Sequence, residues 1–330
     1  MSISPSMVAA QWRNLPIVPK DCTGQTFIVS GSNTGIGLEA AKHFVRLGAA
    51  RVIIAVRSAS KGEAAKDTIE SATGRTGVVE VWPLDLASND SIRAFAKRAS
   101  TELDRIDAVL ENAGVAFAEF TQAEGTETTI QVNVIGTFLL AILLLPALKA
   151  SAERWSITPH LTIVSSGAHC SAQFAEAMHD DIFAALSQAS TSNMADRYAL
   201  SKLLEVYAAR QLARLAPASR TGVVVNLLSP GLCNTDLTRN VGLLRRAPIH
   251  LLRLFLGRSA EMGSRTLLHA AVAGPESHGQ FCADCEVQEH KTAPFVRTDE
   301  GRRVQKRVWD GLVARLEAIE PGCVSTALAL

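Results

Sequence analysis

The chain has 330 residues, of which 33 are Lys or Arg and 32 are Asp or Glu. This near-balance of charge, without a basic stripe, lacks the electrostatic footprint of a nucleic-acid-binding protein, so we expect no nucleic-acid partner. Hydrophobic residues make up 47% and aromatic residues 5% of the chain, which is typical of a packed soluble core rich in Ala, Leu and Val.

Residues 1–22 contain Pro5, Pro16 and Pro19, and we expect them to form an irregular tail on the surface. They lack the compact apolar run and the cleavage site of a signal peptide. The most apolar stretch of the chain, residues 138–148, is too short to span a bilayer. We therefore expect a soluble, cytoplasmic protein without a transmembrane segment.

A buried strand is predicted at residues 26–29, and a glycine-rich turn follows it. Gly31, Gly35 and Gly37 have the spacing G-x-x-x-G-x-G, and residues 38–47 then carry the apolar pattern of a helix. Such a turn lets the backbone approach a pyrophosphate, and the free N–H groups of the first helical turn attract its negative charge. The spacing differs from the G-x-G-x-x-G of the common dinucleotide fingerprint. Taken alone, the turn is also compatible with a glycine-rich loop that binds no nucleotide.

Further along the chain, strands alternate with helices over stretches of about thirty residues or more, which indicates right-handed βαβ units. Predicted strands cover 51–56, 78–84, 106–111, 161–165 and 222–228, and predicted helices cover 61–71, 89–101, 127–149 and 197–215. We predict an α/β fold: a single doubly wound Rossmann-type domain, with a parallel sheet of about seven strands and helices on both faces. This domain would span residues 23–290, and a C-terminal helical extension would cover residues 291–330.

Polar and glycine residues lie at the carboxyl ends of three predicted strands. Asn112-Ala113-Gly114 ends the fourth strand, Ser165-Ser166-Gly167 ends the fifth, and Pro230-Gly231, with Thr235 shortly after, ends the sixth. Open α/β sheets bind their ligands at this edge. We therefore expect these three segments to meet at one site.

Tyr198 and Lys202 are four residues apart on the predicted helix 197–215, so they share one face. A lysine one turn from a tyrosine favours the phenolate and lowers a pKa that is otherwise about 10. A phenol tuned in this way can give a proton to a carbonyl oxygen or take one from an alcohol.

The sequence does not indicate a metal site. Six cysteines are scattered through the chain; Cys282 and Cys285 form a C-x-x-C pair, but no second pair completes a zinc site. We expect all six to be reduced thiols. His179, Asp180 and Asp181 lie together without a further ligand cluster, and a solvated helix N-terminus explains them better than a metal.

Taken together, these motifs resemble those of the short-chain dehydrogenase/reductase superfamily over about residues 23–290. The matching motifs are Ser30-Gly31-x-x-x-Gly35-x-Gly37, Asp85, Asn112-Ala113-Gly114, Asn133, Ser166, Tyr198-x-x-x-Lys202 and Pro230-Gly231. Tyr-x-x-x-Lys alone is common by chance, whereas the whole set in the right order and on the right elements is specific.

The resemblance implies a role for each matching residue. Tyr198 would be the general acid/base, and Lys202 would bind the nicotinamide ribose and lower the pKa of the tyrosine. Ser166 would hydrogen-bond the substrate oxygen, because the catalytic serine of the family is usually the second of such a pair. Asn133 would hold a water for proton relay. The residues expected to bind the cofactor are Gly31, Ser32, Asn33, Gly35, Ile36, Gly37, Arg57, Asp85, Leu86, Asn112, Ala113, Gly114, Tyr198, Lys202, Pro230, Gly231 and Thr235.

Two positions depart from the family pattern. Ser30 replaces the usual Thr before the first glycine and keeps its hydroxyl. Glu111 replaces the first Asn of Asn-Asn-Ala-Gly, and we assign it no chemistry.

The end of the second strand bears on the choice of cofactor. An NAD site places an acid there to bind the ribose 2′-hydroxyl. This chain has Arg57 and Ser58 instead, with Lys61 soon after and no acid before Glu63. An arginine can pair with a 2′-phosphate, so we predict NADP(H), although Arg57 is also compatible with a solvated surface residue.

The region between Ser166 and Tyr198 is longer than in minimal members of the family. The extra stretch, about 169–195, and the late segment 279–285 resemble retinol-dehydrogenase-like and protochlorophyllide-reductase-like members. The long form and Glu111 also resemble fungal secondary-metabolite reductases.

Residues 232–260 correspond to the substrate lid of the family. Within them, 243–256 is rich in Leu, Ile and Phe, which favours a bulky apolar ketone, aldehyde or alcohol. The same stretch is compatible with an amphipathic helix on a membrane surface.

The sequence thus predicts an NADPH-dependent carbonyl reductase or alcohol dehydrogenase that acts on a small molecule, with a role in secondary-metabolite biosynthesis as a further expectation. A non-redox enzyme, such as a dehydratase or cyclase, and a nucleotide-binding regulatory protein are the alternatives on the same fold. The presence of both Tyr198 and Lys202 argues against the regulatory protein. The long helices at 127–149 and 197–215 could pair subunits in a homodimer or merely cover the sheet.

Overall fold

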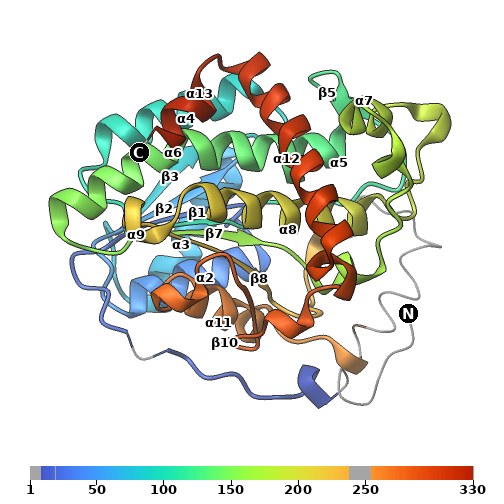
Figure 1. The fold of residues 1–330 in the computed structure, drawn as a ribbon. Helices are drawn as coiled ribbons and strands as arrows, with labels where there is room; N and C mark the ends of the chain where they lie inside the picture. Colours follow the sequence, from blue (N-terminus) through green and yellow to red (C-terminus); the bar gives the residue numbers. More distant parts are fainter. Residues whose placement is uncertain (1–8, 19, 238–252, 254, 330) are drawn as a thin grey trace.

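A computed structural model describes residues 9–18, 20–237, 253 and 255–329. Within these residues a central sheet of eight strands has the order β10-β9-β8-β7-β4-β1-β2-β3 (Figure 1). The strands are β1 (Thr26–Ser30), β2 (Arg51–Val56), β3 (Val79–Pro83), β4 (Ala108–Glu111), β7 (His160–Val164), β8 (Val224–Ser229), β9 (Phe281–Ala283) and β10 (Glu286–Val287). All neighbours pair in parallel except the hairpin β9–β10. The predicted α/β fold with a parallel sheet is therefore confirmed, with one short antiparallel strand added at its edge.

Helices cover both faces of this sheet (Figure 1). One face carries α4 (Asn89–Glu102), α6 (Thr137–Trp155) and α8 (Arg197–Leu215), and the other carries α2 (Gly35–Arg46), α3 (Ala59–Thr73) and α11 (Ala260–Ala270). Alternation along β1 explains why two cores form. Ile28 joins the cluster under α6 and α8, whereas Phe27 and Val29 join the cluster under α2 and α11, since successive strand residues point to opposite faces.

The helical stretch Thr128–Trp155 is long and apolar enough to cross a membrane by length and composition. It consists of α5 (Thr128–Ile130), a π-helical segment η1 (Gln131–Gly136) and α6. Its most apolar window is 83% buried inside the protein. This is the burial of a core helix in a globular fold.

The C-terminal part folds onto the same core. Helix α12 (Asp299–Ile319) packs on α8, and α13 (Cys323–Leu328) packs on α6. Val308, Trp309 and Leu312 are buried and belong to the same hydrophobic cluster as α6 and α8. Helices therefore form most of residues 299–328, while the division of the chain into residues 23–290 and a C-terminal extension of residues 291–330 remains a prediction.

Residues 9–18 of the predicted surface tail make specific contacts with distant parts of the chain. Leu15 is 1% exposed, and its backbone N–H donates to the Met262 sulfur at 3.2 Å. The side chain of Gln11 accepts from the Leu232 N–H at 3.3 Å. Residues 9–11 are helical, and backbone and side-chain contacts to a distant part of the chain bury Leu15, which composition alone does not indicate.

The inserted stretch 169–195 forms short helical turns: η2 (Gly167–Ser171), η3 (Ala175–Met178), α7 (Ile182–Leu186) and η4 (Ala189–Thr191). Asp181 caps α7 by accepting from the Ala184 N–H at 2.9 Å, as expected for a helix N-terminus. A small hairpin of β5 (Gln122–Ala123) and β6 (Thr126–Glu127) lies nearby. Most of the predicted lid, residues 238–252 and 254, lies outside the described residues.

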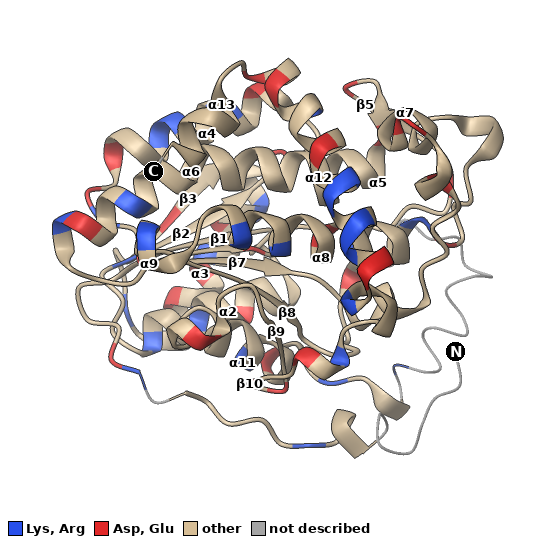
Figure 2. Cartoon of the chain, in the orientation of Figure 1, with Lys and Arg blue, Asp and Glu red and all other residues tan. Residues whose placement is uncertain are grey.

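Two further features are the state of the cysteines and the distribution of surface charge. All six cysteines are free thiols; Cys282 lies in β9 and Cys285 in the turn of the β9–β10 hairpin, where it has a φ of 61°. Lys, Arg, Asp and Glu are interspersed along the outer helices, as on α12, where Arg302 pairs with Asp299 and Lys306 pairs with Asp310 (Figure 2).

Candidate active site

The glycine turn after β1 closely approaches the end of β4. Gly31 and Gly35 have φ values of +65° and +64°, which glycine adopts without strain. A Cβ on Gly31 would lie 2.8 Å from the Ala113 Cα, and one on Gly37 would lie 2.5 Å from the Asn112 Nδ2. Side chains are therefore excluded from the turn by its own neighbours.

Hydrogen bonds from Ser30 and Asn112 hold this arrangement. The Ser30 hydroxyl accepts from the Asn112 and Ala113 N–H groups, both at 2.9 Å. The Asn112 Nδ2 donates to the Ser30 carbonyl at 2.8 Å and to the Gly31 carbonyl at 3.2 Å. The predicted cofactor residues of the first and fourth strands are thus brought together by neutral groups.

Helix α2 begins directly after the turn. Thr34 stands at its N-cap position in an extended conformation, and no described side chain caps the helix or places an acid in its first turn. The first N–H groups are therefore left for an anion, which the helix dipole attracts. A backbone cradle closed to side chains, together with an uncapped helix N-terminus, fits the pyrophosphate of a dinucleotide.

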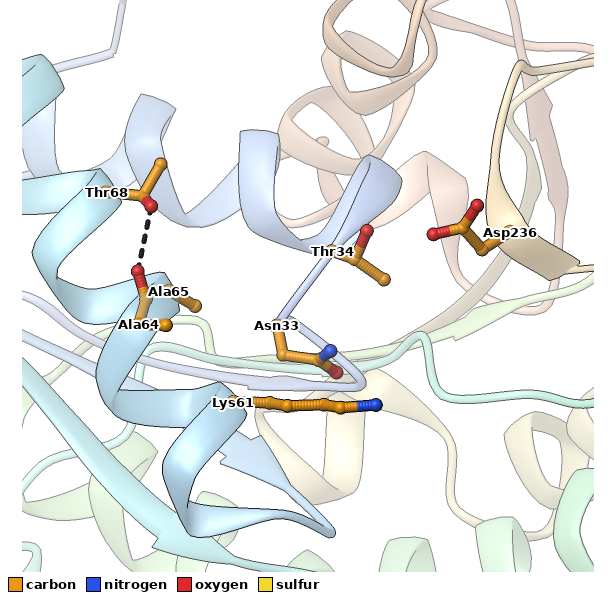
Figure 3. Close-up of a pocket in the computed structure, with 7 residues that line it drawn as sticks. All are labelled: Asn33, Thr34, Lys61, Ala64, Ala65, Thr68 and Asp236. Atoms are coloured by element: carbon orange, nitrogen blue, oxygen red, sulfur yellow. Dashed lines mark hydrogen bonds between the residues drawn. The ribbon is translucent and has the colours of Figure 1, made fainter. Parts of the chain in front are cut away.

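A cavity of about 370 Å³ opens beside this turn, between the start of α2 and the start of α3 (Figure 3). Its lining residues are Asn33, Thr34, Lys61, Ala64, Ala65, Thr68 and Asp236. Lys61 runs alongside Asn33 in Figure 3 and is the cation of this lining. The predicted Arg57 is exposed and is not among the residues that line this cavity, so its role toward a cofactor stays a prediction.

Three further residues predicted to bind the cofactor, Asp85, Leu86 and Thr235, make contacts of other kinds. The Asp85 carboxylate accepts from the Ala87 N–H at 3.0 Å. Leu86 is buried, and its carbonyl lies 2.3 Å from where a Cβ on Gly136 would be. Thr235 packs against Gly35, since a Cβ there would lie 3.3 Å from the threonine methyl group.

Pro230 and Gly231 follow β8, and Arg258 and the N-terminal segment hold them in place. The Arg258 Nη1 donates to the Pro230 carbonyl at 3.2 Å, and its Nη2 reaches the Ala10 carbonyl and the Asp284 carboxylate at 2.6 Å. A Cβ on Gly231 would lie 2.6 Å from the Gln11 Oε1.

Tyr198, Lys202 and Ser166 form a second group at the carboxyl end of the sheet. The Lys202 Nζ lies 5.8 Å from the centre of the Tyr198 ring, as their spacing on α8 predicts. Burial raises the pKa of Tyr198, while Lys202 and a hydrogen bond with the Ser166 side chain lower it. The phenol thus has both a hydroxyl partner and a nearby ammonium group.

Gly114 lies where the two groups meet. A Cβ on it would be 3.4 Å from the Asn133 Oδ1 and 3.6 Å from the Lys202 Nζ. The Asn133 side chain pairs with both backbone groups of Val115 at 2.9 Å and donates to the Ser201 hydroxyl at 2.9 Å. Asn133 therefore fixes the loop after β4 against α8 from within a π-helical segment, a distortion that is frequent at functional sites.

Two buried carboxyl groups, one of which pairs with Lys202, were given no role by the sequence. Glu205 is 2% exposed and accepts a hydrogen bond from the Lys202 Nζ at 2.8 Å. Glu111 is 2% exposed, and the Ser30 hydroxyl donates to it at 3.4 Å. The departure of Glu111 from the family pattern was visible in the sequence, whereas the three-residue spacing from Lys202 to Glu205 has no special signal.

Arg197, immediately before Tyr198, ties the inserted stretch to α8. It is 1% exposed and faces the Glu127 carboxylate at 3.6 Å and the Glu176 carboxylate at 3.4 Å. Its Nη2 also donates to the Ser192 hydroxyl at 2.6 Å. Burial of these charges is costly unless they stay paired, so the insertion and the start of α8 are held as one unit.

Comparisons with known proteins agree with this geometry. Residues 25–158 match the family model described as short chain dehydrogenase. The short chain dehydrogenase/reductase dmxR8 of Cryptosporiopsis sp. is 43% identical over 95% of this chain and 97% of its own length. The short-chain dehydrogenase anuD of Penicillium roqueforti is 42% identical over 93% of this chain and 81% of its own length.

Among solved structures, a complex described as the Pseudomonas aeruginosa RhlG/NADP active-site complex is similar to this fold. It has a TM-score of 0.59 and 24% sequence identity, over 79% of this chain and 94% of that one. The likeness supports the fold, and the two fungal relatives establish the family. The chain belongs to the short-chain dehydrogenase/reductase superfamily, whose members are oxidoreductases with a nicotinamide cofactor.

Proposed function

We propose that this short-chain dehydrogenase/reductase is an NADPH-dependent carbonyl reductase in which Tyr198 is the general acid. The observation that carries the proposal is the meeting of two groups at Gly114. The glycine turn after β1 approaches Ala113, the residue before Gly114, and the Lys202 Nζ on α8 lies 3.6 Å from where a Cβ on Gly114 would be. Tyr198 lies beside Lys202 on the same helix.

The bound NADPH would supply the hydride for reduction of a carbonyl carbon. Tyr198 would hold the proton on its phenolic oxygen and give it to the carbonyl oxygen, and the Ser166 hydroxyl would orient both oxygens. Lys202 would favour the phenolate that remains after proton transfer and bind the cofactor ribose. Run in reverse, the same residues would take the proton from an alcohol.

The preference for NADPH rests on charge at the end of β2. Arg57 and Ser58 occupy the place where an NAD site has an acid, and Lys61 lines the cavity next to the glycine turn. A 2′-phosphate would find two cations within this short stretch. Asp236 lines the opposite part of the same cavity (Figure 3). The positive charges of Arg57 and Lys61 would have to exceed the repulsion between this carboxylate and a 2′-phosphate.

The substrate class proposed is a bulky apolar ketone, aldehyde or alcohol of secondary metabolism. The support is the apolar stretch within residues 232–260 of the sequence and the similarity to fungal relatives over nearly the whole chain. A cytoplasmic location and the division into a tail, a cofactor domain and a C-terminal extension belong to the same proposal.

The test is NADPH oxidation against aliphatic, retinoid and polycyclic carbonyls, with Tyr198→Phe as the diagnostic variant. Loss of general acid catalysis typically costs 10²–10⁴-fold in rate, so we expect kcat to fall at least about 100-fold while NADPH still binds. Tight NADPH binding without reduction of any carbonyl would instead favour a non-redox enzyme or a regulatory protein. Equal use of NADH and NADPH would contradict the cofactor assignment.

A further inference from the structure

The N-terminal segment, residues 9–18, lies against the loop that follows β8. The Gln11 side chain accepts a hydrogen bond from the Leu232 N–H at 3.3 Å, and a Cβ on Gly231 would lie 2.6 Å from the Gln11 Oε1. Ordering a terminal segment costs conformational entropy, so specific contacts must hold it there. The proposed mechanism gives these contacts no role.

Arg258 connects the same segment to the same loop. Its side chain is 1% exposed. The Nη1 donates to the Pro230 carbonyl at 3.2 Å and the Nε donates to the Gln11 carbonyl at 3.4 Å, while the Nη2 pairs with the Asp284 carboxylate at 2.6 Å. Because a guanidinium presents its N–H donors in a fixed plane, this one buried side chain sets the positions of the loop and of the N-terminal segment together.

The segment also contacts both ends of the predicted lid, residues 232–260. Leu232 begins this stretch, and the Trp12 Nε1 donates to the carbonyl of Phe255, near the other end, at 3.1 Å. The two ends pair with each other as well, since the Arg258 N–H donates to the Leu232 carbonyl at 2.8 Å. The N-terminal segment is thus packed at the base of the predicted lid, where that stretch leaves and rejoins the fold.

The loop held in this way is tied to the catalytic group. The Ser229 hydroxyl accepts from the Gly167 N–H at 3.1 Å and from the Gly231 N–H at 3.4 Å. Gly167 directly follows Ser166, the proposed partner of the substrate oxygen. Hydride transfer requires the nicotinamide to lie beside the carbonyl that Ser166 binds, so the loop would border the nicotinamide half of the cofactor. The cavity lined by Lys61, where the 2′-phosphate is proposed to bind, lies between the starts of α2 and α3.

We propose that Gln11 is a positioning residue: by accepting the Leu232 N–H, it fixes the Pro230–Gly231 loop in the conformation that binds the nicotinamide half of the cofactor. The N-terminal segment is then part of the active site, although it precedes the first strand of the sheet. This inference rests on the proposed function in one respect, since it takes a nicotinamide cofactor to bind beside Ser166.

The test compares whole cofactors with a ligand that lacks the nicotinamide half. Adenosine 2′,5′-bisphosphate carries the adenosine and the 2′-phosphate of NADPH but no nicotinamide. In full-length Gln11→Ala the Leu232 N–H loses its acceptor, and loss of such a hydrogen bond changes affinity on the order of fivefold. We expect the dissociation constants of NADPH and NADH to rise by this same factor, as measured by fluorescence titration. The dissociation constant of the bisphosphate, measured by calorimetry, should not change.

Two further variants separate positioning from a general loss of stability. Gln11→Glu keeps an oxygen that can accept the Leu232 N–H, so its NADPH affinity should lie nearer to that of the parent protein than the affinity of Gln11→Ala does. Asn14→Ala removes a contact between the same segment and Arg265 on α11 and should leave NADPH affinity unchanged. Equal weakening of NADPH and the bisphosphate in Gln11→Ala, or weakening of neither, would overturn the proposal.

Hydrogen exchange of the protein without cofactor is the second readout. The Leu232 amide should exchange faster in Gln11→Ala than in the parent protein or in Asn14→Ala, and an unchanged rate would overturn the proposal. NADPH binding without reduction of any carbonyl would refute the proposed function alone, because the comparison with the bisphosphate would still decide the role of Gln11. A parent protein that binds neither NADPH nor NADH would refute both.

Discussion

The glycine turn at residues 31–37 and the Tyr198–Lys202 end of α8 meet at Gly114 but are held in place by different kinds of contact. Neutral hydrogen bonds from Ser30 and Asn112 and the lack of space for a Cβ hold the turn. Buried ionisable groups hold the α8 end: Lys202 with Glu205 and Glu111 behind it, and Arg197 with its carboxylate partners.

This difference indicates how each end can respond to its surroundings. The backbone and amide contacts of the turn do not titrate near neutral pH, and among the described residues the one titratable group that touches them is Glu111, through the Ser30 hydroxyl. The fit of the turn to a dinucleotide should therefore depend on shape much more than on pH. The contacts of the α8 end include carboxyl groups whose pKa values are raised by burial. Stability and proton donation at that end should therefore depend on pH, and shape should matter most at the turn.

The largest expected effect is on stability, at Arg197. Replacement by Ala leaves the buried Glu127 and the partly buried Glu176 without Arg197, and breaking a buried ion pair in this way costs about 3–5 kcal/mol. Chemical denaturation of Arg197→Ala against the parent protein measures it. The control is Arg302→Ala, whose ion pair with Asp299 is exposed and should contribute less than about 1 kcal/mol. Equal losses in the two variants would contradict a special role of buried charge at this end.

A second prediction concerns shape at the turn. Gly37→Val places carbon atoms where the Asn112 Nδ2 lies 2.5 Å from the expected Cβ, so we expect NADPH affinity to fall about 100-fold, or roughly 2.7 kcal/mol, at every pH tested. Fluorescence titration with NADPH measures the dissociation constant. Gly74→Ala is the matched control, because Gly74 has a positive φ but open space around it; it should lose some stability and keep NADPH affinity. A loss of NADPH affinity that varies with pH would contradict the idea that shape alone governs binding at the glycine turn.

The same contrast separates what could be predicted from the sequence from what could not. Strand and helix bounds followed from local apolar patterns, and helix 197–215 matches its predicted range. The glycines are marked in the sequence because their constraint is local. Glu205 and Arg197 were missed because their roles depend on partners brought close by the fold, such as Glu176 from the inserted stretch. Lys61 was noted but ranked behind Arg57, since sequence distance from β2 does not show which side chain lines the cavity.

A third prediction uses the pH dependence of stability at Glu111. Its pKa is raised from 4.5 to about 8 in the folded protein, so the folded state keeps a proton that the unfolded state loses above its ordinary pKa. Stability is thus fully present at acidic pH and is lost as pH rises from about 4.5 towards 8. Relative to Glu111→Gln, the parent protein should lose about 2 kcal/mol between pH 5 and pH 7. Denaturant titrations of both proteins across this range measure the difference, and parallel pH curves would show that Glu111 is ionised when folded.

The smallest expected effect concerns cofactor preference at Lys61. Because Lys61 lines the cavity beside the turn and Arg57 does not, Lys61→Ala should weaken NADPH binding about tenfold, or roughly 1.4 kcal/mol, and leave NADH binding unchanged. The loss should shrink at high salt, since the contact to a 2′-phosphate would be a partly exposed charge pair. Lys66→Ala on the same helix, outside the cavity lining, controls for a general loss of positive charge. An equal loss of NADH affinity in Lys61→Ala would mean that Lys61 shapes the cavity but does not contact the 2′-phosphate. A loss of NADPH affinity in Arg57→Ala alone would mean that Arg57, the exposed residue after β2, selects NADPH.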